Sequence, residues 1–162
     1  MRKVKGKGAY VRILMVCLGN ICRSPMAEYV LRHLVSEAGL DGVIQVDSAA
    51  TSRYQIGDLP HHGTQRMLAK QGIYCGRHRA RQMTRADYDR YDLIVGMDEE
   101  NRSDILRIVR RDPQHKVHTL LDWTDHPRAI ADPWYTGDFD TTYADVREGC
   151  ETLLEYLQKQ GL

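Results

Sequence analysis

Short apolar runs alternate with longer amphipathic stretches through most of this 162-residue chain. The run from Val11 to Val16 is almost continuously apolar, which is typical of a strand buried on both faces. Further strands are predicted at 43–49, 92–97 and 117–121. Because strands that alternate with helices pair in parallel through right-handed crossovers, the pattern favours an α/β fold. We expect one domain, with a four-stranded parallel sheet and helices on both of its faces.

The predicted helices lie between these strands and after the last one. Ser24 offers an N-cap and Pro25 suits the first helical position, so the first helix is expected to begin there and to end near Gly39. Thr84 and Asp87 resemble the cap of a short helix. Further helical stretches are predicted at 63–71, 101–109 and 143–157.

Composition limits the class of protein. The net charge of +1 argues against a nucleic acid or an acidic membrane surface as partner. The longest apolar run, Ile13 to Cys17, is far too short to span a bilayer. Four cysteines do not make a disulfide scaffold in a chain of this size, so we expect a reduced, cytoplasmic protein. Residues 1–10 are interpreted as a flexible basic lead-in, and residues 11–162 as the folded domain.

Seven histidines raise the question of a metal site. His61 and His62 are adjacent, and His115 and His118 are three residues apart. Neither pair has a nearby cysteine or carboxylate at ligand spacing. The sequence therefore predicts no metal and no cofactor.

The loop after the first predicted strand carries the strongest functional signal. Ligands of parallel α/β folds sit at the carboxyl ends of the strands, and here Cys17 and Arg23 flank five uncharged residues. Gly19 and Asn20 tolerate backbone angles that turn successive N–H groups inward around an anion. The helix N-terminus adds its dipole, and Arg23 can grip two phosphoryl oxygens. The same positive field stabilises a thiolate at Cys17.

The spacing alone does not identify the site, because Cys75 precedes Arg81 by the same interval. Three of the five residues in that second interval are bulky and basic, no strand leads into it and no Ser-Pro pair follows. We therefore interpret Cys75 as a packing thiol.

Two blocks of sequence resemble the low-molecular-weight protein tyrosine phosphatases. "VCLGNICRSPMAE", starting at Val16, is similar to that family's signature, and "ADPWYTGDFDTTY", starting at Ala131, is similar to its general-acid loop. Shorter matches lie between them, in the family's order. The resemblance implies a flavodoxin-like strand order of 2-1-3-4 and a metal-independent phosphatase. It also implies a phosphotyrosine protein as partner, such as a tyrosine kinase. Oligomeric state stays open.

The resemblance implies a role for each site residue. Cys17 would attack phosphorus, Arg23 would bind the phosphoryl oxygens, and Asp132 would be the general acid. Cys22 would form a reversible disulfide with the nucleophile. The remaining residues would form the phosphate-binding loop and its support (Leu18, Gly19, Asn20, Ile21, Cys22, Ser24, Ser48) and the aromatic substrate wall (Tyr54, Trp134, Tyr135).

Two positions depart from the family's pattern, and three other acids compete with Asp132. Tyr54 stands where a tryptophan is frequent, and around His78 the chain is one residue longer, so no role is assigned to His78. Of four acids expected after strands, Asp132 alone is followed by proline and two aromatic residues, which suit a phenyl ester. The competing acids are Asp98, Asp122 and Asp125.

Three other functions use a similar loop. A phosphoarginine phosphatase tends to carry threonine where this chain has Ile21, whose hydrocarbon suits a phenyl ring better. An arsenate reductase needs a downstream cysteine pair, whereas Cys75 and Cys150 are far apart in sequence. A non-enzymatic anion sensor would not need the full set of catalytic residue types. Phosphotyrosine hydrolysis is the preferred hypothesis.

Overall fold

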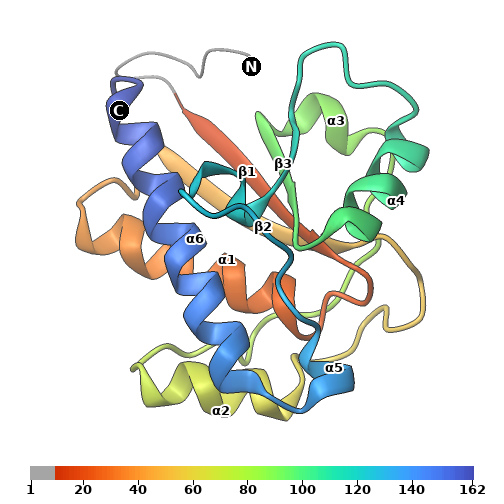
Figure 1. Ribbon diagram of the computed structural model, residues 1–162, viewed down its shortest axis with the longest axis vertical. Coiled ribbons are helices and arrows are strands. Elements are labelled where there is room, and N and C mark those ends of the chain that lie inside the picture. Colours follow the sequence, from red (N-terminus) through yellow and green to blue (C-terminus); the bar gives the residue numbers. More distant parts are fainter. Residues whose placement is uncertain (1–9) are drawn as a thin grey trace.

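The computed structural model describes residues 10–162, so nearly all of the predicted lead-in lies outside the described residues. Its centre is a four-stranded parallel sheet (Figure 1), made of β1 (Val11–Cys17), β2 (Ile44–Ala50), β3 (Leu93–Gly96) and β4 (Val117–Thr119). The strand order is β2-β1-β3-β4, which confirms the predicted α/β sheet and its order.

The register of the central strands fixes where their ends meet. β1 pairs with β2 from Val11 opposite Ile44 to Cys17 opposite Ala50. On its other side, β1 pairs with β3 up to Val16. Cys17 therefore lies at the carboxyl edge of the sheet, between the loops that follow both neighbouring strands.

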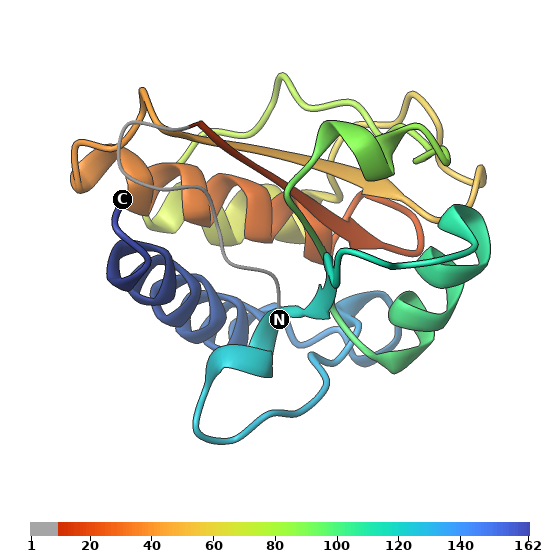
Figure 2. The same ribbon diagram turned by 90° about the horizontal axis from the view of Figure 1, so that it is seen from above.

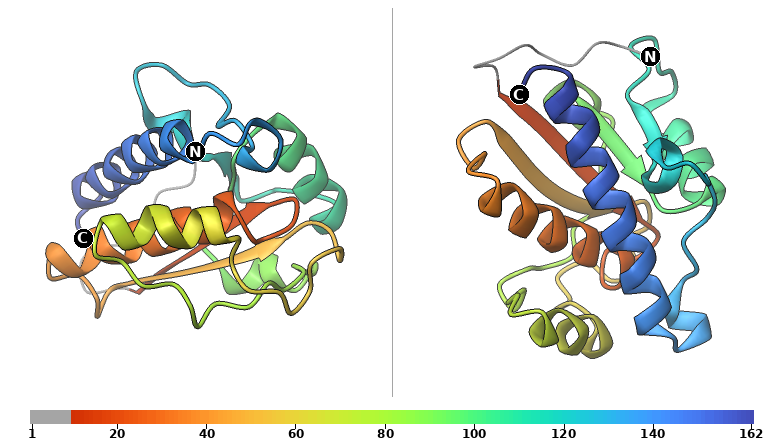
Figure 3. Two further views of the ribbon diagram at one scale, coloured as in Figure 1. Left: turned by 90° about the horizontal axis from the view of Figure 1, so that it is seen from below. Right: turned by 60° about the vertical axis from the view of Figure 1, so that its left-hand side comes forward.

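Helices cover both faces of the sheet, as predicted. One face packs against α1 (Arg23–Glu37) and α6 (Phe139–Lys159), with α2 (His62–Lys70) beside them (Figures 2 and 3). The other face packs against α3 (Asp87–Arg90) and α4 (Glu99–Val109). Side chains of β1 alternate between the two apolar cores, so this strand is buried on both faces.

The first helix begins differently from the prediction. α1 starts at Arg23, its N-cap residue is Cys22, and no side chain caps it. Ser24 lies in the first turn instead, where its hydroxyl contacts the sulfur of Cys17. The predicted N-cap role of Ser24 is therefore wrong, because the loop around Cys17 uses that hydroxyl.

Two other segments also differ from the prediction. The fourth strand stops at Thr119, and the 3-10 helix η1 (Leu120–Trp123) follows it. A capping box between Thr119 and Asp122 ends the strand there. In the loop before α6, the short helix α5 (Pro133–Thr136) is capped by Asp132. Within residues 10–162, no helix combines the length and apolarity that a membrane crossing requires.

Candidate active site

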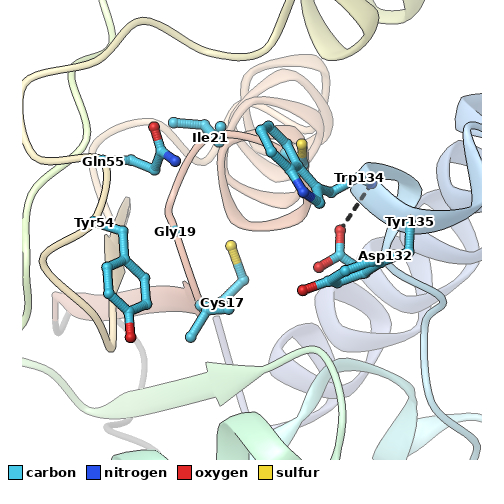
Figure 4. Close-up of a pocket in the computed structure, with 10 residues that line it drawn as sticks. Cys17, Gly19, Ile21, Tyr54, Gln55, Asp132, Trp134 and Tyr135 are labelled. Carbon is cyan, nitrogen blue, oxygen red and sulfur yellow. Dashed lines mark hydrogen bonds between the residues drawn. The ribbon is translucent and has the colours of Figure 1, made fainter.

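The loop between β1 and α1 wraps around the sulfur of Cys17. The backbone N–H groups of Asn20 and Ser24 donate to this Sγ at 3.3 and 3.4 Å. Sγ and the Ser24 hydroxyl share a further hydrogen bond of 3.0 Å. The Cys17 side chain points into an open slot (Figure 4). N–H groups that converge on one sulfur form the anion cradle that the sequence predicted.

Asn20 stabilises this loop through hydrogen bonds of its side chain. It is fully buried and adopts a left-handed φ of 59°, a conformation that asparagine tolerates better than most residues. Its side-chain amide donates to the hydroxyls of Ser24 (2.8 Å) and Ser48 (2.9 Å). Its side-chain oxygen accepts the backbone N–H of Arg81 at 3.1 Å. The structure thus brings together Asn20, Ser24 and Ser48, as the sequence predicted.

Two buried residues extend this support, and the sequence reasoning missed both. Ser48 donates its hydroxyl to Glu28 at 2.5 Å, and the Nε2 of His78 bonds the carbonyl of Asn20 at 3.0 Å. Burial raises the pKa of Glu28 and lowers that of His78. Because the carbonyl of Asn20 can only accept, the Nε2 of His78 carries the proton of this bond. Glu28 already stood in the signature block, as a charged residue on the inner face of the first predicted helix.

Arg23 is a buried residue in the first turn of α1. Its Nη1 donates to the carboxylate of Asp98 at 2.7 Å and to the carbonyl of Ile130 at 2.8 Å. Its Nη2 lies 3.5 Å from the carboxylate of Asp132. Burial opposes the charge on Arg23, but the surrounding Cys17, Asp98 and Asp132 hold its pKa above the ordinary value. The guanidinium therefore stays charged beside the sulfur.

The four competing acids have different positions. Asp132 faces the slot and accepts the backbone N–H of Trp134 at 3.0 Å, an interaction drawn in Figure 4. Asp98 caps α4 and holds Arg23, so it anchors the arginine. Asp122 pairs with Arg102 at 3.0 Å instead, and Asp125 is an exposed loop residue.

A cleft of about 230 Å³ opens above Cys17. Tyr54 stands on one side of it, and Trp134 and Tyr135 stand on the other (Figure 4). These three rings are largely exposed and leave the slot accessible from solvent. Gln55, which the sequence did not suggest, also lines the slot. A Cβ on Gly19 would lie 3.3 Å from the Cγ of Gln55, so the glycine lets that side chain approach the loop.

Cys22 lies inside the loop as a buried free thiol that also lines the slot. Burial, together with Cys17 and Asp132, raises the pKa of Cys22 to about 12. Among residues 10–162 there is no cluster of three histidine, cysteine or acidic side chains that could hold a metal ion.

Known proteins resemble this chain over nearly its full length. The family model for low molecular weight phosphotyrosine protein phosphatases matches residues 12–162. A low molecular weight protein-tyrosine-phosphatase of Bacillus subtilis, YfkJ, is 40% identical over 152 residues, which cover 93% of this chain and 97% of the relative. A low molecular weight phosphotyrosine protein phosphatase of Gallus gallus is 39% identical over 153 residues, covering 91% and 96%.

Solved structures give the same result. The crystal structure of YfkJ superposes with a TM-score of 0.93 at 39% identity and covers 97% of this chain and 100% of that one. An arginine phosphatase of Drosophila has a TM-score of 0.83 at 29% identity, with 90% and 96% covered. Sequence and fold agree with these relatives over nearly all of the described residues, and the chain belongs to the low molecular weight phosphotyrosine protein phosphatase family.

Proposed function

We propose that this protein hydrolyses phosphotyrosine in proteins through a phosphocysteine intermediate on Cys17. One observation carries the proposal: the Cys17 sulfur sits at the floor of an aromatic slot, with loop N–H groups around it and Asp132 beside Arg23. We assign the activity to one domain, residues 11–162.

In the first step the Cys17 thiolate attacks phosphorus. A sulfur–phosphorus bond forms while the bond from phosphorus to the tyrosine oxygen breaks. Asp132, as a carboxylic acid, gives its proton to the departing phenolate. Backbone N–H groups of the loop and Arg23 bind the three remaining phosphoryl oxygens, whose charge they stabilise in the transition state.

In the second step water attacks the phosphocysteine. The Asp132 carboxylate takes the proton of that water, the sulfur–phosphorus bond breaks, and inorganic phosphate leaves. The Cys17 thiolate departs more readily because the Ser24 hydroxyl can donate to it across the observed 3.0 Å. The chain is thereby returned to its starting state with one water consumed.

The guanidinium of Arg23 is already oriented in the absence of substrate. Asp98 and Ile130 both accept from Nη1, which fixes the plane of the guanidinium. Nη2 has only a long contact of 3.5 Å to Asp132, which a phosphoryl oxygen can replace. A planar donor held in this way can bind two oxygens at once, which a lysine cannot do. We therefore assign Asp98 a positioning role.

The slot favours a flat aromatic ester. Tyr54, Trp134 and Tyr135 offer faces for stacking, and the hydrocarbon of Ile21 also lines the slot. The Drosophila neighbour keeps phosphoarginine as a second candidate, because its fold covers most of this chain. Ile21 favours phosphotyrosine, since a phosphoarginine guanidinium would need a polar partner where this chain has only hydrocarbon.

Arsenate reduction has less support. It would need cysteines that relay a disulfide from Cys17. The sulfur of Cys150 is fully buried against the carbonyl of Ala27, on the inner side of α6. Burial raises the pKa of this thiol well above the ordinary range, so it is a poor nucleophile there.

The substrates of this family are phosphoproteins. Within the proposal, a phosphorylated tyrosine kinase is one such substrate, and the location is cytoplasmic. The four free thiols support a reducing setting. Reversible protection of Cys17 by Cys22 also belongs to the proposal.

Peptides that carry phosphotyrosine, phosphoserine or phosphoarginine test the proposal directly. With a chelator present, wild type should release phosphate fastest from phosphotyrosine, and Cys17→Ser should release none. Asp132→Ala should be slowed, most strongly on substrates with poor leaving groups. Full activity of Cys17→Ser would refute the mechanism. Faster turnover of phosphoarginine would replace the substrate assignment and keep the nucleophile.

A further inference from the structure

The start of α2 lies beside the first turn of α6 (Figure 1). Three aromatic rings meet at this place. The ring of His61 stacks on that of Phe139, with 5.2 Å between centroids, and meets the ring of Trp134 edge-on at 5.8 Å. We call His61, Trp134 and Phe139 the aromatic junction. His61, considered above only as a possible metal ligand, therefore contacts a wall of the slot.

His61 is also tied to the phosphate-binding loop and to α2. Its backbone N–H donates to the carbonyl of Ile21 at 2.8 Å. Its ring Nδ1 accepts the backbone N–H of Gly63 at 3.0 Å, so His61 caps α2 at a position where serine, threonine, aspartate or asparagine is usual. This bond requires Nδ1 without a proton and fixes the orientation of the ring.

Phe139 lies directly on the backbone of α2. A Cβ on Gly63 would come within 2.4 Å of the ring carbon Cζ of Phe139, so a side chain there would displace the ring. The same ring packs against Ile21 and Cys22 of the phosphate-binding loop. The aromatic junction therefore joins α2, α6 and that loop, and Trp134 forms its edge at the slot.

We propose that His61 is a positioning residue whose capped ring holds Trp134, and through it the Asp132 carboxylate, at a fixed place over the phosphate-binding loop. The path from the ring to the acid is short, because the backbone N–H of Trp134 itself donates to the Asp132 carboxylate at 3.0 Å. The other end of the acid segment is held independently, where Ile130 accepts from Arg23 at 2.8 Å. The inference rests on the proposed function, in which Asp132 is the acid.

Charge around His61 favours the neutral ring that this role needs. Burial lowers the pKa of His61, and His62 and Arg66 lower it further. The N-terminal end of α2 adds a field of the same sign. Across the aromatic junction, the Asp138 carboxylate is turned toward Thr141, to which it is hydrogen-bonded. The neutral ring, with its proton on Nε2, keeps the cap intact.

Two substitutions separate the ring from the cap. His61→Asn keeps a cap acceptor and removes the ring, whereas His61→Phe keeps a ring and removes the acceptor. His62→Asn is the matched control, because His62 stacks on His61 at 4.3 Å on the exposed side. The measurement is kcat/KM, which reports formation of the phosphocysteine and not its hydrolysis, on two substrates. The leaving group of phenyl phosphate needs the acid, whereas that of 4-nitrophenyl phosphate hardly does.

The positioning role predicts a selective loss. His61→Asn should lower kcat/KM on phenyl phosphate about tenfold and leave that on 4-nitrophenyl phosphate within about twofold. His61→Phe keeps a ring but loses the cap that orients it, so it should show a smaller selective loss of about threefold on phenyl phosphate, and His62→Asn should stay within about twofold on both substrates. In an Asp132→Ala background, His61→Asn should cause no further loss. An equal loss on both substrates, or full additivity with Asp132→Ala, would overturn the inference.

A second readout does not depend on activity. With Trp123→Phe in place, Trp134 is the single tryptophan, because the chain has two. His61→Asn should then increase quenching of its fluorescence by acrylamide, while His62→Asn should not. Unchanged quenching in His61→Asn would refute the positioning role even in an active enzyme. Increased quenching in a protein without phosphatase activity would keep the contact and refute the proposed function.

Discussion

Cys17 and Cys75 each precede an arginine by six residues, and the structure gives the two pairs opposite properties. The Cys17 sulfur receives two backbone N–H groups and opens onto the slot. Cys75 is buried in the core packed around α1 and α6. Burial, reinforced by Glu28, raises the pKa of Cys75 to about 11. One thiol is placed to react and the other to pack.

The two arginines differ in the same sense. Arg23 is almost fully buried and shares its donors among Asp98, the carbonyl of Ile130 and Asp132, the last of which lines the slot. Arg81 is committed to the carboxylate of Asp87 through two bonds of 3.2 Å, and a 3.5 Å contact with Tyr91 adds to them. The comparison shows that a six-residue spacing between cysteine and arginine does not by itself make an anion-binding site. A strand that ends at the cysteine, and a loop that turns its N–H groups inward, create the site.

Replacing each cysteine in turn should give the largest difference in activity between the two pairs. Cys17→Ser should reduce kcat by more than about 10⁴-fold, because it removes the nucleophile. Cys75→Ala should leave kcat within about twofold and lower the free energy of unfolding by about 1 kcal/mol. Phosphate release and urea denaturation measure both. Loss of activity in Cys75→Ala at unchanged stability would mean that the second pair has a catalytic role.

The rates of alkylation of the individual thiols should show the next largest difference. With a pKa of about 11, the Cys75 thiolate fraction at pH 8 is about one in a thousand, and that of Cys22 is smaller still at about 12. Because the raised pKa values favour the protonated thiols, labelling of both should increase as pH rises toward 11. At pH 7, iodoacetamide should modify Cys17 first, as peptide mapping would show. Early labelling of Cys75 would contradict its assignment as a packing thiol.

The arginines should differ by a smaller factor. Arg23→Lys should lower kcat/KM about 10²-fold, since a lysine cannot offer two parallel donors to phosphate. Arg81→Lys should keep kcat/KM within about threefold and lower the free energy of unfolding by about 1 kcal/mol, because Asp87 is fully buried while Arg81 is partly exposed. Steady-state kinetics and denaturation test the pair. Equal kinetic losses would remove the distinction.

The carboxylate partners should show the smallest effects. Asp98→Asn should lower kcat/KM about tenfold, because Arg23 loses the charged anchor at 2.7 Å that orients it. Asp87→Asn should leave kinetics near wild type and lower the free energy of unfolding by about 1–2 kcal/mol. A purely structural Asp98 would instead lower stability and leave kcat/KM unchanged.

Much of the fold could be predicted from the sequence for one physical reason. Apolar runs buried on both faces, such as Val11–Val16, are hard to mistake, and alternation with helices determines a parallel sheet. The ends of the helices and strands depend on which hydrogen bonds their terminal side chains make, and the apolar periodicity does not show this. Ser24 contacts the Cys17 sulfur and does not cap α1, and Thr119 with Asp122 ends the fourth strand early.

The site divides in a similar way. Cys17, Arg23 and the loop between them could be predicted from local sequence, and Asp132 required the family resemblance as well. Other contacts join segments far apart in the chain. The bonds from Arg23 to Asp98 and from His78 to Asn20 span 75 and 58 residues, so no local pattern reveals them.

A trapped intermediate tests the central claim most directly. Asp132→Ala should still be phosphorylated by 4-nitrophenyl phosphate, whose leaving group needs little protonation, and should release phosphate slowly because the base for water is missing. After rapid acid quench, mass spectrometry should find one phosphoryl group, on the peptide that contains Cys17, and none in Cys17→Ser. A phosphoryl group on another residue, or steady turnover with no phosphoenzyme and an active Cys17→Ser, would contradict the account.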